Sequence, residues 1–169
     1  MKTLTLSAII LFVLSTFSFA QDSTHQHTEH LDAMVSSYLE IKNALVNDDF
    51  EQAQSALQAF ADEVINSKEM NHHPEHSEMH KTHHNKMTSA INSALESENI
   101  SQLRNSFDDI SDHLTTALKN QGYKEELYVQ YCPMADNGNG AKWISKNEKI
   151  ENPYYGAKMH SCGETMKAL

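Results

Sequence analysis

Residues that bend or interrupt a chain are scarce in this 169-residue sequence, which has 5 glycines and 3 prolines. A collagen-like or low-complexity chain is therefore excluded, and the length suits one ordinary domain. Basic side chains are scarce as well, since 13 Lys and Arg face 23 Asp and Glu, for a net charge of −10. A negative field repels phosphate and attracts cations, so we expect no nucleic-acid partner.

Long apolar runs are also missing, apart from one at the start. Lys2 precedes the apolar stretch 6–14, and Ser18-Phe19-Ala20 follows as a small-x-small cleavage pattern. This pattern is typical of a secretory signal peptide over residues 1–20. The run is too short to span a membrane, so we expect no membrane insertion after signal removal. The expected location is the periplasm, with the extracellular space as the alternative.

Catalytic motifs are absent from the sequence. It contains no Gly-rich phosphate loop, no Gly-x-Ser-x-Gly and no His-Glu-x-x-His. We therefore predict no catalytic residues and a protein that is not an enzyme.

Apolar residues at steps of three and four predict four helices over residues 31–122, and short connections favour an antiparallel four-helix bundle. Asn47 to Asp49 separate the first two helices, Asn99 with Gln102 forms a capping-box start for the fourth, and Gly122 ends it. Residues 21–30 form an expected flexible, histidine-containing N-terminus, and residues 69–87 a His- and Met-rich connection.

Residues 123–169 lack the helical pattern of the preceding region. An alternating aromatic stretch over residues 127–131 and the turn signal Asn137-Gly138-Asn139-Gly140 predict short strands and loops. The predicted fold class is therefore mainly α, with a C-terminal non-helical cap packed on the bundle.

The cap carries two groups of soft ligands, Cys132-Pro133-Met134 and Met159-His160-Ser161-Cys162. Thiolates and thioethers select soft metals, so Cu(I) is the expected cofactor. Trp143 lies between the groups and is a candidate for stacking on the cation. The alternative is a structural disulfide between Cys132 and Cys162, with both methionines filling the core. The candidate primary ligands are Cys132, Met134, Met159, Cys162 and His160.

A second candidate site lies in the connection between the second and third helices. If Pro74 opens the third helix, His76, His80 and His84 share one face and can chelate zinc or Cu(II). The alternative is a solvated polar connection without a specific role. The candidate secondary ligands are His72, His73, His76, Met79, His80, His83, His84 and Met87, to which His25, His27 and His30 can add.

Three motifs of the cap resemble a known family. They are Tyr131-Cys132-Pro133-Met134-Ala135, the stretch 140–145 around Trp143, and the stretch 150–163 that ends in Cys162-Gly163. The chain resembles a bacterial exported domain of unknown function that occurs alone and at the C-terminus of periplasmic adaptor subunits of copper and silver efflux pumps. The resemblance covers nearly all of residues 31–166 and implies a metal-linked periplasmic role.

Two hypotheses follow. The first is a periplasmic protein that binds a heavy metal, with copper favoured, and serves metal handling or efflux. The second is a disulfide-stabilised helical module that docks on an efflux adaptor or another envelope partner and binds metal only incidentally.

Overall fold

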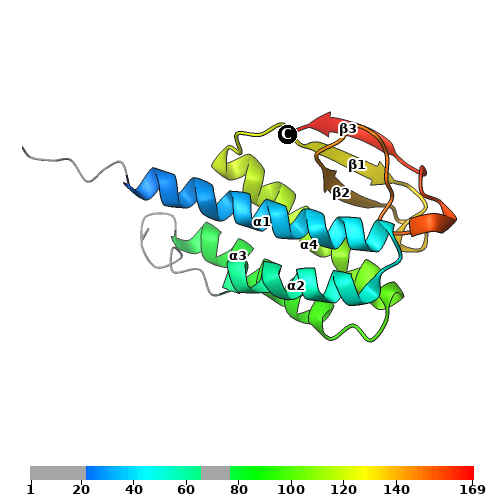
Figure 1. Ribbon diagram of the computed structural model, residues 1–169. Coiled ribbons are helices and arrows are strands. Elements are labelled where there is room, and N and C mark those ends of the chain that lie inside the picture. Colours follow the sequence, from blue (N-terminus) through cyan, green and yellow to red (C-terminus); the bar gives the residue numbers. More distant parts are fainter. Residues whose placement is uncertain (1–21, 66–76) are drawn as a thin grey trace, which may run out of the picture.

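A computed structural model gives the structure of the protein. It describes residues 22–65 and 77–169, with the side chains of residues 29–65 and 84–169. Helices come first along the chain and a small sheet follows (Figure 1). The predicted fold class, a mainly α bundle with a C-terminal cap of strands and loops, is confirmed.

The helices lie lengthwise beside one another, with α1 against α2 and α3 against α4 (Figure 1). Each buries an apolar stripe, because residues three and four apart share one face of a helix. In α2, for example, Ala53, Leu57 and Phe60 are fully buried. The helices are α1 Asp22–Val46, α2 Phe50–Ile65, α3 Ser77–Leu95 and α4 Ile100–Gln121.

The residues predicted to cap α4 do so. The Asn99 side chain accepts hydrogen bonds from two backbone amides of the first turn, both at 3.1 Å. The Gln102 side chain accepts one from the backbone nitrogen of Glu98 at 2.7 Å, a variant of the capping box. Gly122 ends the helix in the left-handed conformation (φ 74°), which costs glycine little.

Helix α1 begins earlier than the sequence predicts. We expect a flexible segment over residues 21–30, but residues 22–30 continue the helix from Asp22. Their polar side chains are tolerated in a helix yet show no apolar period, so the sequence pattern carries no signal there.

The cap contains a three-stranded antiparallel sheet in the order β2-β1-β3. Its central strand pairs with both neighbours, and Gln130 lies opposite Trp143 on one side and Thr165 on the other. The strands are β1 Tyr128–Cys132, β2 Ala141–Ser145 and β3 Glu164–Ala168. Two short 3-10 helices, η4 Asp136–Gly138 and η5 Gly156–Lys158, lie in the connections.

The sheet and the bundle share one core. The rings of Tyr38 on α1 and Phe107 on α4 are stacked, with centroids 5.0 Å apart. Tyr154 of the cap packs on Phe107 at 6.0 Å, and Trp143 packs on Tyr154 at 6.0 Å. This chain of aromatic contacts joins the bundle to the cap, so the two parts form one hydrophobic unit.

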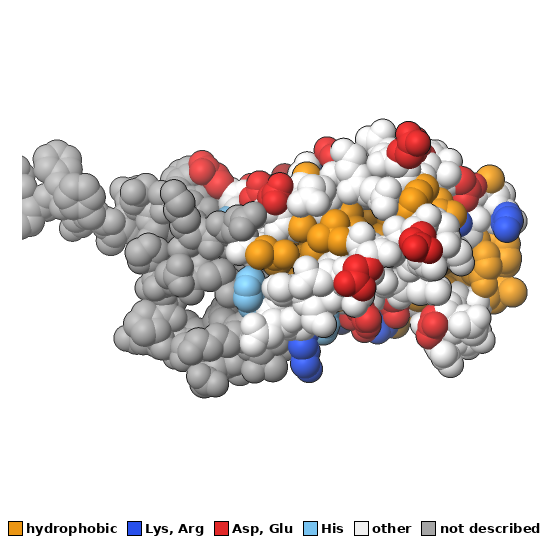
Figure 2. All heavy atoms as spheres, turned by 90° about the horizontal axis from the view of Figure 1, so that it is seen from below, with side chains coloured by type: hydrophobic (Ala, Val, Ile, Leu, Met, Phe, Trp, Pro, Cys, Tyr) orange, Lys and Arg blue, Asp and Glu red, His pale blue; other side chains and the backbone are white. Residues whose placement is uncertain are grey.

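The surface carries the acidic excess of the sequence. Figure 2 shows the face formed by α2 and α3, with Asp and Glu side chains scattered across it and few basic ones. Within residues 22–65 and 77–169, no helix is long and apolar enough to cross a membrane.

Candidate metal centre

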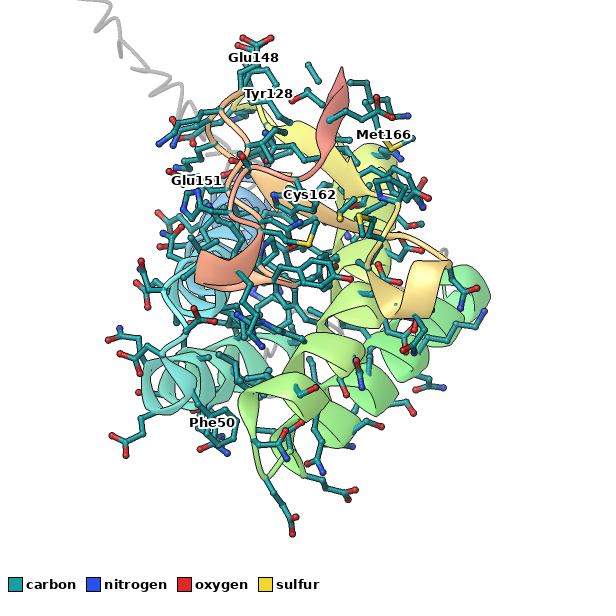
Figure 3. All side chains as sticks on the ribbon, turned by 90° about the vertical axis from the view of Figure 1, so that its right-hand side faces the viewer. Phe50, Tyr128, Glu148, Glu151, Cys162 and Met166 are labelled. Atoms are coloured by element: carbon teal, nitrogen blue, oxygen red, sulfur yellow. The ribbon has the colours of Figure 1, made fainter. Side chains whose placement is uncertain are left out.

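The structure brings the two cysteines together. Cys132 ends the central strand β1, and Cys162 lies in the loop between η5 and β3. Their sulfur atoms are 3.2 Å apart, and no disulfide joins them in this structure. Cys132 is fully buried, whereas Cys162 is partly exposed at the end of the molecule that Figure 3 presents.

A buried asparagine fixes the loop that carries Cys162. The Asn152 side chain donates a hydrogen bond to the carbonyl oxygen of Cys162 at 2.7 Å. Its backbone nitrogen donates to the carbonyl oxygen of His160 at 2.8 Å. Its side-chain oxygen accepts from the amides of Tyr154 at 2.8 Å and Tyr155 at 3.3 Å. One side chain therefore holds both ends of the segment 153–162.

Arg104 of α4 anchors the start of the same segment. Its guanidinium donates to the carbonyl oxygens of Pro153 at 2.7 Å and Leu45 at 2.6 Å. It also donates to the Asp48 carboxylate at 2.6 Å. That carboxylate accepts a further bond from the amide of Ala157 at 3.0 Å, so η5 is tied to the turn between α1 and α2.

Gly156 is required where this anchor meets η5. It has φ 53°, and a Cβ added there would lie 2.3 Å from Asp48 Oδ1 and 2.6 Å from Arg104 Nη2. Any larger side chain would displace the carboxylate and the guanidinium.

The other predicted soft ligands lie on the segments that carry the cysteines. Met134 follows Cys132 and is 51% exposed, and its carbonyl oxygen accepts a hydrogen bond from the Tyr155 hydroxyl at 2.5 Å. Met159 and His160 are partly exposed, and the Met159 carbonyl oxygen accepts from the amide of Cys162 at 3.0 Å.

The neighbouring thiol and burial favour the protonated form of Cys162 in the metal-free pair. The hydrogen bond with Cys132, followed by burial, raises the pKa of Cys162. Metal ligands must be deprotonated, so metal binding at this pair would release protons.

Among the described side chains, no three from His, Cys, Asp and Glu are grouped closely enough to hold a metal ion. The two thiols are the donors that the structure brings together here, and Met134 and Met159 lie on the segments that carry them. Such a donor set is soft and suits Cu(I).

Trp143, predicted to stack on a bound cation, is completely buried. Its ring touches the segment next to Cys162, because a Cβ added at Gly163 would lie 2.9 Å from Trp143 Cη2. The indole nitrogen has no hydrogen-bond partner within the part of the chain that the structure describes. Stacking on a cation stays a prediction, and it would need an ion that enters the core.

The histidine-rich tract is described only in part. His72, His73, Pro74 and His76 lie outside the described residues, as do the side chains of Met79, His80 and His83, although the backbone from Ser77 onward is in α3. Partial burial lowers the pKa of His84. Met87 is buried in the hydrophobic core, where it packs as an apolar residue. His30 lies 3.8 Å from the Glu63 carboxylate on α2.

The sequence did not single out Asn152. Asn152-Pro153 predicts a turn, and no local pattern indicates that the side chain reaches a residue ten positions further on.

The architecture defines a four-helix domain with a strand cap. Residues 34–126 match the model of the family described as "Protein of unknown function (DUF3347)", and the chain belongs to that family. The match covers most of the bundle and ends before β1, so the cysteines and methionines of the cap lie outside it. Neither the curated proteins nor the solved structures contain a significant match to this chain.

Proposed function

We propose that this protein binds a soft heavy-metal ion in the bacterial periplasm, with Cu(I) the favoured cargo, and that it serves metal handling or efflux. The contact between Cys132 and Cys162 is the observation that carries the proposal. Two sulfur atoms from segments 30 residues apart lie 3.2 Å from each other, and the partly exposed Cys162 gives access from solvent. Two thiolates with added thioethers match the low coordination number and soft character of Cu(I).

The loop around the cysteines supports the same proposal. Asn152 and Arg104 fix the segment that carries Met159, His160 and Cys162 by hydrogen bonds to its backbone. A donor that is already held in place loses less conformational freedom when it binds an ion. The methionine side chains remain free to turn toward the ion, because Met134 is half exposed and Met159 is partly exposed.

The test is Cu(I) competition against a chromogenic chelator, with reduced protein under anaerobic conditions. We expect one Cu(I) per chain in the unmodified protein and none in the variant with Cys132→Ser and Cys162→Ser. Uptake that survives the loss of both cysteines would contradict the cap site.

A matched pair of variants tests the thioether contribution. Met134 and Met166 are exposed to 51% and 53%, so replacing either with leucine disturbs packing to a similar extent. We expect Met134→Leu to weaken Cu(I) binding at least ten-fold and Met166→Leu to leave it unchanged. Equal affinities in the two variants would remove Met134 from the ligand set.

The alternative function is a helical interaction module stabilised by a disulfide. The same sulfur contact favours it, because an oxidant can close the pair into a covalent link between β1 and the loop before β3. Thiol counting on protein purified from the periplasm distinguishes the two. A disulfide that resists mild reduction, together with binding to an efflux adaptor that persists in the double cysteine variant, would favour the module.

The histidine-rich tract remains a proposed secondary site for zinc or Cu(II). Replacing His80, His83 and His84 with glutamine should lower the number of weakly bound Zn(II) ions in equilibrium dialysis and leave Cu(I) binding at the cap intact. An unchanged Zn(II) count would make the tract a solvated connection.

A further inference from the structure

A cavity of about 510 Å³ lies where α4 meets the sheet. Its wall includes Asp112, His113, Thr115, Thr116 and Lys119 of α4, together with residues of α3 and of all three strands. None of the candidate metal ligands lines it, so it is separate from the cysteine pair. Its volume is within the range of sites that hold small molecules.

Four lysines line this cavity, and each comes from a different element. They are Lys86 of α3, Lys119 of α4, Lys142 of β2 and Lys167 of β3. Asp112 is the one acidic residue among the lining residues, and its carboxylate lies 3.4 Å from Lys142 Nζ. The cavity wall is therefore strongly positive in a chain whose net charge is −10.

The lysines that line the cavity repel one another. Partial loss of hydration, followed by repulsion from Lys167 and Lys142, lowers the pKa of the exposed Lys119. Like charges that face one cavity are unfavourable unless an anion lies between them. A bound anion would therefore relieve a repulsion that the fold itself imposes.

A buried hydroxyl lies in the same wall. Thr115 lines the cavity and is only 5% exposed. Its hydroxyl oxygen has no hydrogen-bond partner among the residues that the structure describes. An unpaired buried hydroxyl is unfavourable, but its oxygen is covered by protein, so a ligand oxygen would satisfy it only after the Thr115 side chain turned toward the cavity.

We propose that this cavity binds a multivalent, phosphate-bearing anion. A single carboxylate would leave most of the four ammonium groups without a counter-charge, whereas a phosphate or diphosphate offers two or more negative charges and several acceptor oxygens. Lysine binds phosphate as a point charge and does not need the planar geometry of arginine. Met166 and Val129, which also line the cavity, provide apolar contacts for the remainder of the ligand.

The experiment uses inorganic pyrophosphate as the probe, titrated into the full mature chain and followed by the methyl NMR signals of Val129 and Met166. We expect saturable shifts of both signals. The variant with Lys119→Gln and Lys167→Gln should bind at least ten-fold more weakly. All substituted side chains are exposed, so folding is preserved, and an amide NMR spectrum verifies it.

A charge-matched variant, Lys124→Gln with Lys158→Gln, is the control. Both lysines are exposed and do not line the cavity, so the net charge changes equally in the two variants. We expect less than a two-fold loss in this control. Equal weakening in both variants, or methyl signals that do not move, would overturn the proposal.

Two further arms identify the source of the phosphate. Vesicles of phosphatidylcholine with added phosphatidic acid present a lipid phosphate, whereas pyrophosphate represents a free one. Binding to either that depends on Lys119 and Lys167 supports the proposal and assigns the source. Binding of a glutamate-rich peptide without binding of either phosphate probe would make the cavity a docking place for an acidic segment and overturn it.

Discussion

The hydroxyl of Tyr38 accepts a hydrogen bond from the backbone nitrogen of Ile144 at 3.0 Å, which joins helix α1 to strand β2 through the core. The same hydroxyl lies 2.7 Å from the Ser111 hydroxyl of α4, and all three groups are buried. Burial raises the pKa of Tyr38, so the phenol stays neutral and able to donate. One side chain thus connects two helices and the cap.

Removing this hydroxyl should destabilise the whole molecule. Tyr38→Phe leaves the Ile144 amide without a partner, and we expect the free energy of unfolding to fall by about 1–3 kcal/mol. Tyr128→Phe is the control, because Tyr128 is partly exposed on the sheet and should change the free energy by less than about 0.5 kcal/mol. Urea denaturation measures both. Similar losses in the two variants would contradict the role given to Tyr38.

Adding a methyl group at Gly156 should disturb the anchor of η5. Gly122 provides the comparison, since it also has a positive φ (74°) but nothing lies within 4 Å of an added Cβ. Gly122→Ala should cost about 1 kcal/mol from backbone strain alone. Gly156→Ala should cost more and should also raise the rate at which a thiol reagent modifies Cys162. Unchanged Cys162 reactivity would show that the anchor does not control the loop.

Acid should weaken the ion pair between Asp48 and Arg104. The hydrogen bond from Arg104 lowers the pKa of Asp48 in the folded state, so this stabilisation is present above the unfolded pKa of about 3.9 and is lost as the pH falls through the folded value. The difference in unfolding free energy between the unmodified protein and Asp48→Asn should therefore narrow as the pH is lowered toward about 2. Because the Asp48 side chain is 42% exposed, the effect is modest.

Chemical denaturation at a series of pH values measures the unfolding free energies of the unmodified protein and of Asp48→Asn, and so their difference. Asp109→Asn, a change at an exposed aspartate of α4, serves as the control. If the difference in unfolding free energy between the unmodified protein and Asp48→Asn stays constant across the pH range, the Asp48 carboxylate does not stabilise the fold through its pair with Arg104.

Alkylation can test the interaction between the thiols directly. The contact with Cys132 is the main cause that raises the pKa of Cys162, so the pH midpoint for its reaction with iodoacetamide should exceed the ordinary cysteine value of about 8.5. Cys132→Ala removes the neighbouring thiol and should lower that midpoint. Ser161→Ala changes the exposed residue beside Cys162 and should leave the pH midpoint unchanged. A midpoint that Cys132→Ala leaves unchanged would mean that burial alone sets this pKa.

The bundle could be predicted from the sequence because its signals act over short stretches of chain. Asn99 and Gly122 cap α4 through atoms a few residues away, and the apolar period of α2 repeats every three or four residues. The N-terminal part of α1 escaped prediction because a polar helix has no such period.

The candidate site could be predicted only as a set of residue types. Cys132 and Cys162 are visible as soft ligands, but their contact depends on the register of β1 and on the path of the loop that Asn152 holds. No pattern in the sequence indicated the lysine-lined cavity. Lys86 and Lys167 come from elements far apart in the sequence, and only the packing of the sheet on α4 brings such residues to one wall.

Because Cys132 lies in a strand and Cys162 in a loop, the backbone around the two cysteines should unfold locally at different rates. Cys132 is the buried last residue of β1 and lies opposite Ala141 of β2, so its surroundings open only when that strand pair separates, and amide hydrogen exchange there should be slow. Cys162 belongs to a loop that can move by breaking a few hydrogen bonds. An incoming reagent, whether an oxidant or a metal donor, should therefore meet Cys162 first, and Cys132 would complete the reaction as the second, slower partner.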